Sequence, residues 1–164
     1  MAIVSGDIAY RLSGGASNSD PSLSIGGVKS SVSAGSNLFD ALTSAEAAAG
    51  DIEYRCFYVH NAHATLTMLS ARSFIPTNTS SPDTVLEIGV GVAAVNGTET
   101  PVANESTAPA GVTFSSPTDY ASGVALGDIP PGQHRAVWLR RTVTASAASA
   151  TDVSTVRTQC DTNP

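Results

Sequence analysis

The chain has 164 residues, of which 13% are charged and 5% are aromatic, so its length fits one domain and its core must come mainly from Val, Ile, Leu and Ala. It carries 8 Lys and Arg residues against 14 Asp and Glu residues, a net charge of −6 at pH 7 with neutral histidine. An acidic chain of this kind lacks the basic surface that binds nucleic acid or anionic lipid, and we expect neither as a partner.

The sequence contains no pattern typical of a membrane segment or a leader. A membrane helix needs about 18 consecutive apolar residues, and no such run occurs. Residues 1–7 lack a basic region followed by an apolar run, so we expect no signal peptide. Without a secretory signal, free thiols are the favoured state of Cys56 and Cys160. A bridge between them is the alternative, and it would need Cα atoms within roughly 7 Å.

Residues 1–36 are poor in large apolar side chains and rich in Gly, Ser and Ala. Within them, residues 7–12 alternate enough to predict one strand, and residues 13–21 are a run of turn formers. Such a segment buries too little surface to hold itself together. We therefore expect an extended N-terminal arm that packs against a neighbouring subunit, with a flexible terminus as the alternative.

Residues 37–50 hold the best candidate for a helix. Asn37 is the expected N-cap and Gly50 the expected C-cap of a one- or two-turn helix that covers a sheet edge. From residue 51 onward, β-branched and aromatic residues alternate with polar ones between turn formers. We expect strand regions at 51–60, 64–75, 84–95, 112–114, 134–145 and 153–158.

Two segments in this part of the chain allow more specific predictions. In residues 51–60, the face expected to point into the core carries Ile52, Tyr54, Cys56 and Tyr58. The Asn96-Gly97 pair lies between two β-capable runs and predicts a hairpin, because both turn positions favour positive φ.

The most convincing strand, residues 134–145, follows a turn at residues 128–133. One of its faces is apolar, and Trp138 is expected over the opposite face, at an interface. Six to eight strands at this spacing predict an all-β fold. We expect an antiparallel β-sandwich, immunoglobulin-like or jelly-roll-like, over residues 37–164, with the arm of residues 1–36 and one short helix.

No motif of catalysis or cofactor binding is present: the chain lacks G-x-S-x-G, both glycine-rich phosphate motifs and paired CxxC units. The histidines could hold a metal only if a turn joined them to a further ligand such as Asp51, and they are His60, His63 and His134. We expect no enzyme, no cofactor and no metal. The only positive cluster is Arg135, Arg140 and Arg141. Ordinary surface salt bridges are its favoured role, and contact of one arginine with a partner is the alternative.

Four segments carry a resemblance to a known class of proteins: residues 10–18 (YRLSGGASN), 37–40 (NLFD), 50–56 (GDIEYRC) and 129–133 (IPPGQ). They resemble small structural proteins encoded in the virion gene clusters of tailed bacteriophages. The Pro-Gly-Gln turn before a Trp-bearing strand also resembles immunoglobulin-like modules. The resemblance implies a non-enzymatic virion protein, assembled in the host cytoplasm, that decorates and stabilises a capsid.

The partners that this resemblance implies are the major capsid protein or other virion proteins, together with further copies of the chain, a trimer being the usual arrangement by analogy. A tail, neck or fibre component is an alternative, as is a receptor- or carbohydrate-binding module that would need exposed aromatic rings. The rings available for a sugar site are Tyr54, Tyr58, Tyr120 and Trp138. The residues expected at an interface are Tyr10, Arg11, Leu23, Ile25, Trp138 and Arg140.

Overall fold

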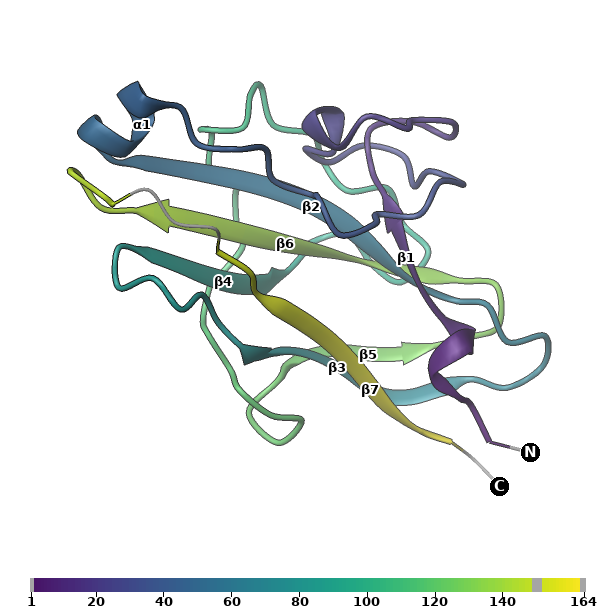
Figure 1. Ribbon diagram of the computed structural model, residues 1–164. Helices are drawn as coiled ribbons and strands as arrows, with labels where there is room; N and C mark the ends of the chain where they lie inside the picture. The colour runs from purple at the N-terminus through teal and green to yellow at the C-terminus, as the bar shows by residue number, and fades with distance from the viewer. Residues whose placement is uncertain (1, 149–151, 163–164) are drawn as a thin grey trace.

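The computed structural model describes residues 2–148 and 152–162, and they form two antiparallel sheets packed as a β-sandwich (Figure 1). This confirms the all-β expectation. In the first sheet the strand order is β1 (Ile8–Leu12), β2 (Asp51–Asn61), β6 (His134–Val143) and β4 (Thr84–Val90). In the second sheet the order is β5 (Val124–Ile129), β3 (Met68–Thr77) and β7 (Thr155–Thr162).

Three short helical segments accompany the sheets: η1 (Ser5–Asp7), η2 (Pro21–Leu23) and α1 (Ser44–Ala49). Among the described residues, no helix combines the length and the apolar character that crossing a membrane requires. Gly50 ends α1 with a φ of 80°, as expected. The N-cap is Thr43 rather than Asn37, because Thr43 and Glu46 form a capping box, each side chain bonding the other's backbone N–H.

The main core lies between the two sheets, and it corrects the prediction for β2. Phe57 and Val59 point into this core, together with side chains of β6, β4, β3 and β5. The opposite face of β2, which was expected to do so, carries Tyr54, Cys56 and Tyr58 into a second buried cluster with Trp138. Since β2 is buried on both faces over residues 53–59, its alternation alone could not rank the two faces.

Residues 2–36 are held against the sandwich of their own chain, and contact of this segment with a neighbouring subunit stays a prediction. Strand β1 pairs with β2 from Ile8 to Leu12. The hydroxyl groups of Ser13 and Ser24 both donate to the carbonyl of Cys56 at 2.9 Å. Hydrogen bonds from backbone and serine side chains hold this segment in place, and a count of its apolar residues could not reveal them.

The predicted strand regions appear with shifted ends, and three details differ. Strand β5 was not predicted, and residues 112–114 form no strand. The turn at Asn96-Gly97 does form, with a φ of 62° at Asn96, but no hairpin surrounds it. The reason is Glu99, whose carboxylate accepts from the backbone N–H groups of Val92 and Ala93 and folds this loop onto itself.

Candidate protein-docking site

Three of the four sheet edges are covered or interrupted by the chain itself. The outer edge of β1 bonds residues 30–34, for example through Leu12 N–H to the carbonyl of Val32 at 3.1 Å. The outer edge of β4 is covered by Asn78 and Ser115, which bond the backbones of Leu86 and Ile88. Strand β5 has only six residues and is broken by a φ of 81° at Gly127. These devices are the usual ways of protecting an edge.

Across residues 2–148 and 152–162, no strand pairs with the fourth edge, that of β7. On its outer side, the backbone of the described part of β7 makes one hydrogen bond, in which the N–H of Thr158 donates to the hydroxyl of Tyr10 at 2.9 Å. Backbone groups alternate in direction along an antiparallel strand, so those of Val156 and Cys160 point the same way as those of Thr158. Strand β7 has eight residues, and its outward backbone groups before and after Thr158 are available to pair with another strand.

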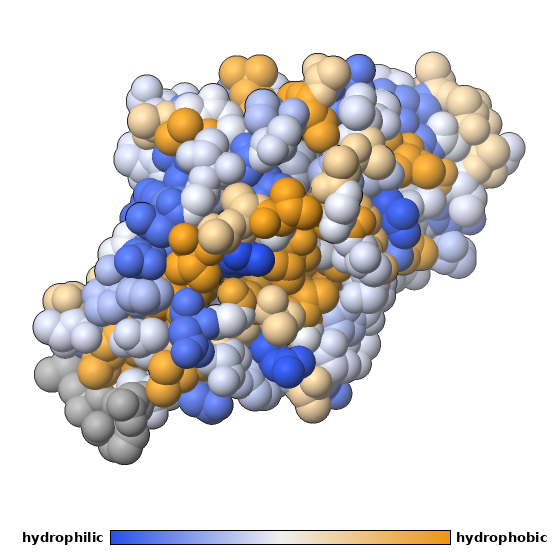
Figure 2. Space-filling model, turned by 180° about the vertical axis from the view of Figure 1, so that it is seen from behind, coloured by the Kyte–Doolittle hydropathy of each residue, from blue (hydrophilic) through white to orange (hydrophobic). Residues whose placement is uncertain are grey.

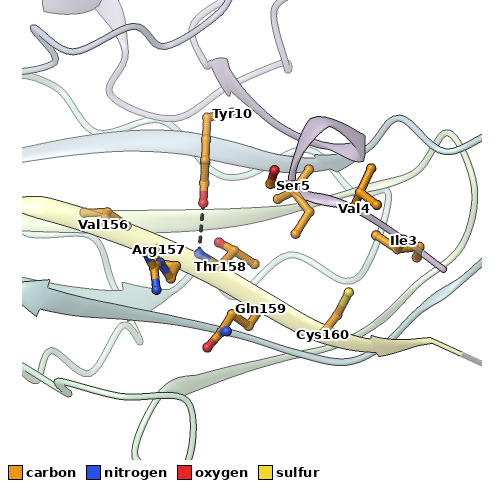
Figure 3. Close-up of a pocket in the computed structure, with 10 residues that line it drawn as sticks. Ile3, Val4, Ser5, Tyr10, Val156, Arg157, Thr158, Gln159 and Cys160 are labelled. Carbon is orange, nitrogen blue, oxygen red and sulfur yellow. Dashed lines mark hydrogen bonds between the residues drawn. The ribbon is translucent and has the colours of Figure 1, made fainter.

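A groove of about 480 Å³ runs beside this edge, where the sandwich is open between β1 and β7 (Figure 3). Ile3, Ile8 and Tyr10 line one side, and Val156 and Cys160 line the other. All five pack against the main core and are only partly buried. The chain therefore presents unpaired backbone next to incompletely covered core side chains.

The opposite side of the molecule has its own apolar surface. Figure 2 shows hydrophobic residues gathered across the middle of that face, bordered by hydrophilic ones. On the outer face of the first sheet, Ile52 and Val85 both lie opposite Thr142 of β6, and each is 44% exposed. This short apolar row marks the uncovered end of that sheet face.

The residues expected at an interface are scattered. Only Tyr10 lies at the groove. Arg11 donates to the carbonyl of Ser31, Arg140 bonds Glu87 at 2.7 Å, and Ile25 is half-buried. Leu23 is exposed, on η2.

Trp138 corrects the expectation of an interface position, because its side chain is fully buried. It lies on the face opposite the apolar one, as predicted, but segments of the same chain cover that face. Its indole N–H donates to the buried carboxylate of Glu99 at 3.3 Å. Sequence pattern could place the ring on a face and could not show what covers it.

A partly buried ionic network occupies one end of the first sheet. The side chain of Arg55 is 1% exposed and pairs with Asp40 and Glu105, while Arg141 pairs with Glu53 and Asp40. Burial raises the pKa of Glu53 to about 7, against the attraction of Arg141. The oxygens of the three carboxylates lie within 4.8 Å of one another, as ligands of a metal would. Here each of the three carboxylates already pairs with one or both of the two guanidinium groups.

The histidines and cysteines are placed apart from the groove, except for Cys160. His60 and His134 lie opposite each other in β2 and β6, and burial lowers the pKa of both rings. His63 is separate from this pair and accepts backbone hydrogen bonds from Thr65 and Leu66. Both cysteines are free thiols, and burial raises the pKa of the enclosed Cys56.

Most of the residues that line the groove were not predicted from the sequence. The alternation in residues 153–158 did predict a strand there, but nothing in it indicates an edge position or the neighbouring Ile3 and Ile8. Comparison with protein-family models, curated proteins and solved structures finds no match.

Proposed function

We propose that this chain is a non-enzymatic structural protein of a tailed-phage virion, which stabilises the capsid through protein contacts. The observation that carries the proposal is the open edge of β7 beside the exposed border of the core. Strand addition to such an edge supplies backbone hydrogen bonds, and a neighbouring apolar groove receives alternate side chains. The resemblance of four segments to virion structural proteins supports the same role.

The ionisable groups support a scaffold rather than a reactive centre. Arg55, Arg140 and Arg141 are each paired with carboxylates of the same chain. Such pairs fix strands and loops in place, and they leave the groove beside β7 lined mainly by apolar and neutral polar side chains. This lining suits contact with another protein.

The aromatic rings favour protein contact over carbohydrate binding. A sugar site needs aromatic faces open to solvent beside polar groups. Tyr54, Tyr58 and Trp138 are at most 7% exposed, so these three rings are occupied by packing inside the molecule. The remaining candidate, Tyr120, lies on the loop before β5 and bonds the carbonyl of Ser70.

The test uses particles of the phage that carries the gene. Mass spectrometry of purified particles should find the chain, and cryo-electron microscopy should place it at symmetric positions on the head. Particles assembled without it should release their DNA at a lower temperature than complete ones. Complete particles that lack the chain would refute the proposal, and density confined to the tail or neck would refute the capsid position.

A further inference from the structure

We propose that the occupant of the β7 edge is β7 of a second copy of this chain, paired antiparallel about a two-fold axis at Gln159. The pairing joins two three-stranded sheets into one six-stranded sheet. This inference deepens the proposed function and rests on it for the use of this edge as a protein contact. Its basis is the register that β7 allows and the charges along its exposed face.

Backbone direction restricts the possible registers. The outward-pointing groups belong to Val156, Thr158, Cys160 and Thr162, as the bond from Thr158 to Tyr10 establishes. An antiparallel partner must pair these residues with one another. A two-fold axis at Gln159 meets this condition, because it places Thr158 opposite Cys160 of the second copy and Val156 opposite Thr162.

Charge selects this register among those allowed. The exposed face of β7 carries Thr155, Arg157, Gln159 and Asp161 in sequence. With the axis at Gln159, each Arg157 lies opposite Asp161 of the other copy, which gives two ion pairs. With the axis at Thr158, Arg157 would instead lie opposite Gln159. Within the described residues Arg157 forms no ion pair, so its charge is available.

In the same arrangement, the second strand covers the groove. Side chains of the second strand at alternate positions lie over the open border of the core, next to Ile3 and Ile8. Val4, 61% exposed where the chain enters η1, borders the same region. The N–H of Thr158 exchanges the hydroxyl of Tyr10 for a backbone carbonyl, so no donor is lost.

The first test exchanges the two charges and measures self-association of the purified chain by sedimentation velocity. Arg157→Asp places two carboxylates opposite each other, and Asp161→Arg places two guanidinium groups opposite each other. Each variant should raise the dimer dissociation constant about tenfold, from two lost pairs and two like-charge contacts. The double variant R157D/D161R should restore it.

The two single changes are controls for each other. They alter the net charge in opposite directions, so a general charge effect would weaken association in one variant and strengthen it in the other. Weakening in both, with recovery in the double variant, is the specific result. Circular dichroism checks that each variant keeps the fold of the unmodified chain.

The second test places cysteines on the strand in a Cys160→Ser background. With the axis at Gln159, Gln159→Cys brings two thiols onto a directly opposed pair, with Cβ atoms about 5 Å apart. Thr155→Cys is the matched control on the same face, because its two copies lie eight positions apart, about 27 Å. A disulfide-linked dimer of the first variant and not of the second is expected on a non-reducing gel.

A chain that stays monomeric in sedimentation, with no dimer of Gln159→Cys, overturns the inference. Equal cross-linking of Gln159→Cys and Thr155→Cys overturns it as well, because random collision would then explain both. These outcomes are separate from the failure of the proposed function. A monomeric chain that is found in particles ends the two-fold pairing only, and a dimeric chain absent from particles ends the virion role only.

Discussion

The indole of Trp138 donates its N–H to Glu99, and both side chains are almost completely removed from solvent on the outer face of the first sheet. Glu99 also accepts from the backbone N–H groups of Val92 and Ala93, at 3.2 and 2.9 Å. One carboxylate therefore holds the loop that follows β4 against the centre of the sheet, where it covers the second cluster.

Glu99→Ala should destabilise the chain by about 2–3 kcal/mol, because it leaves the buried indole N–H of Trp138 without an acceptor, at roughly 1–3 kcal/mol. The partly buried N–H groups of Val92 and Ala93 lose their acceptor as well and add a smaller amount. Glu99→Gln is the matched control. It keeps the shape and one acceptor oxygen, so its loss should be clearly smaller. Urea unfolding measures both, and equal losses would contradict the role given to the acceptor oxygens.

Arg55→Ala should cost about 2–4 kcal/mol of unfolding free energy, because it leaves the carbonyls of Leu38 and Tyr54 without a donor, at roughly 1–3 kcal/mol each. Asp40 and Glu105 also lose this cation, but their side chains are 65% and 40% exposed, so solvent replaces most of the attraction. Arg55→Lys keeps the charge and loses the fork of donors that also reaches the carbonyl of Leu38. The unfolding free energy of this variant should lie between that of the alanine variant and that of the unmodified chain. An alanine variant as stable as the unmodified chain would remove any structural role from this network.

The pair of His60 and His134 predicts acid sensitivity. Burial lowers the pKa of each ring, and the positive charge of Lys29 acts in the same direction on both, with Arg11 adding to it at His60. The folded state then binds protons less readily than the unfolded chain, whose histidines have a pKa of about 6.5. The unfolding free energy should therefore fall as the pH is lowered from 7.5 to 5.5.

The control for this pH effect is the double variant His60→Gln/His134→Gln, which should lose most of the decline in thermal midpoint. Glu53 acts with the opposite sign, because its raised pKa makes the folded state bind a proton more readily than the unfolded chain. It is present in both proteins, so the difference between them reports the histidines. Identical pH profiles would disprove the assignment.

Gly89→Ala should destabilise the chain by about 1–3 kcal/mol through overpacking. A β-carbon at Gly89 would lie 2.6 Å from both the carbonyl oxygen of Thr113 and a methyl group of Val112. Gly6→Ala is the matched control, because a β-carbon there meets no atom within 4 Å. Thermal unfolding should separate the two variants, and an equal effect would mean that the close approach at Gly89 is not what matters.

Tyr10→Phe should have two effects of opposite direction. It removes the acceptor of the Thr158 N–H and should lower the stability of the monomer by about 1 kcal/mol. It also frees that N–H for a second strand, so self-association should increase. Sedimentation velocity and urea unfolding measure the two effects, and a variant that associates less would contradict the competition between the hydroxyl and a strand.

Local sequence patterns predicted most strands, but they did not predict which segments pack against each strand. Alternation identified β6 and placed Val137 and Leu139 on one face, because side chains of a strand alternate whatever lies around it. It failed for the faces of β2 because both are buried over residues 53–59, and covering segments decide which face meets the second sheet. The capping box of Thr43 and Glu46 was present in the sequence and would have corrected the helix start.

Local sequence patterns could not predict the groove, because it depends on contacts between distant residues. Whether β7 is an edge depends on which strands it pairs with, and its pairing partner β3 lies about 85 residues earlier at Ser73 and Thr158. The covering of the other edges likewise depends on distant contacts, such as Ser115 on Ile88. The open edge is thus a property of the assembled topology, and no stretch of sequence carries it.

The backbone N–H of Ile3 donates to the side chain of Thr162, a contact between residues 159 positions apart. Near this contact β1 and the segment before it meet the last strand along one side of the core. During synthesis on the ribosome, β7 emerges after all other strands, so that side of the nascent protein stays unsealed until translation has passed residue 162. A chain stalled before that point would expose core side chains and would be a target for chaperones and proteases.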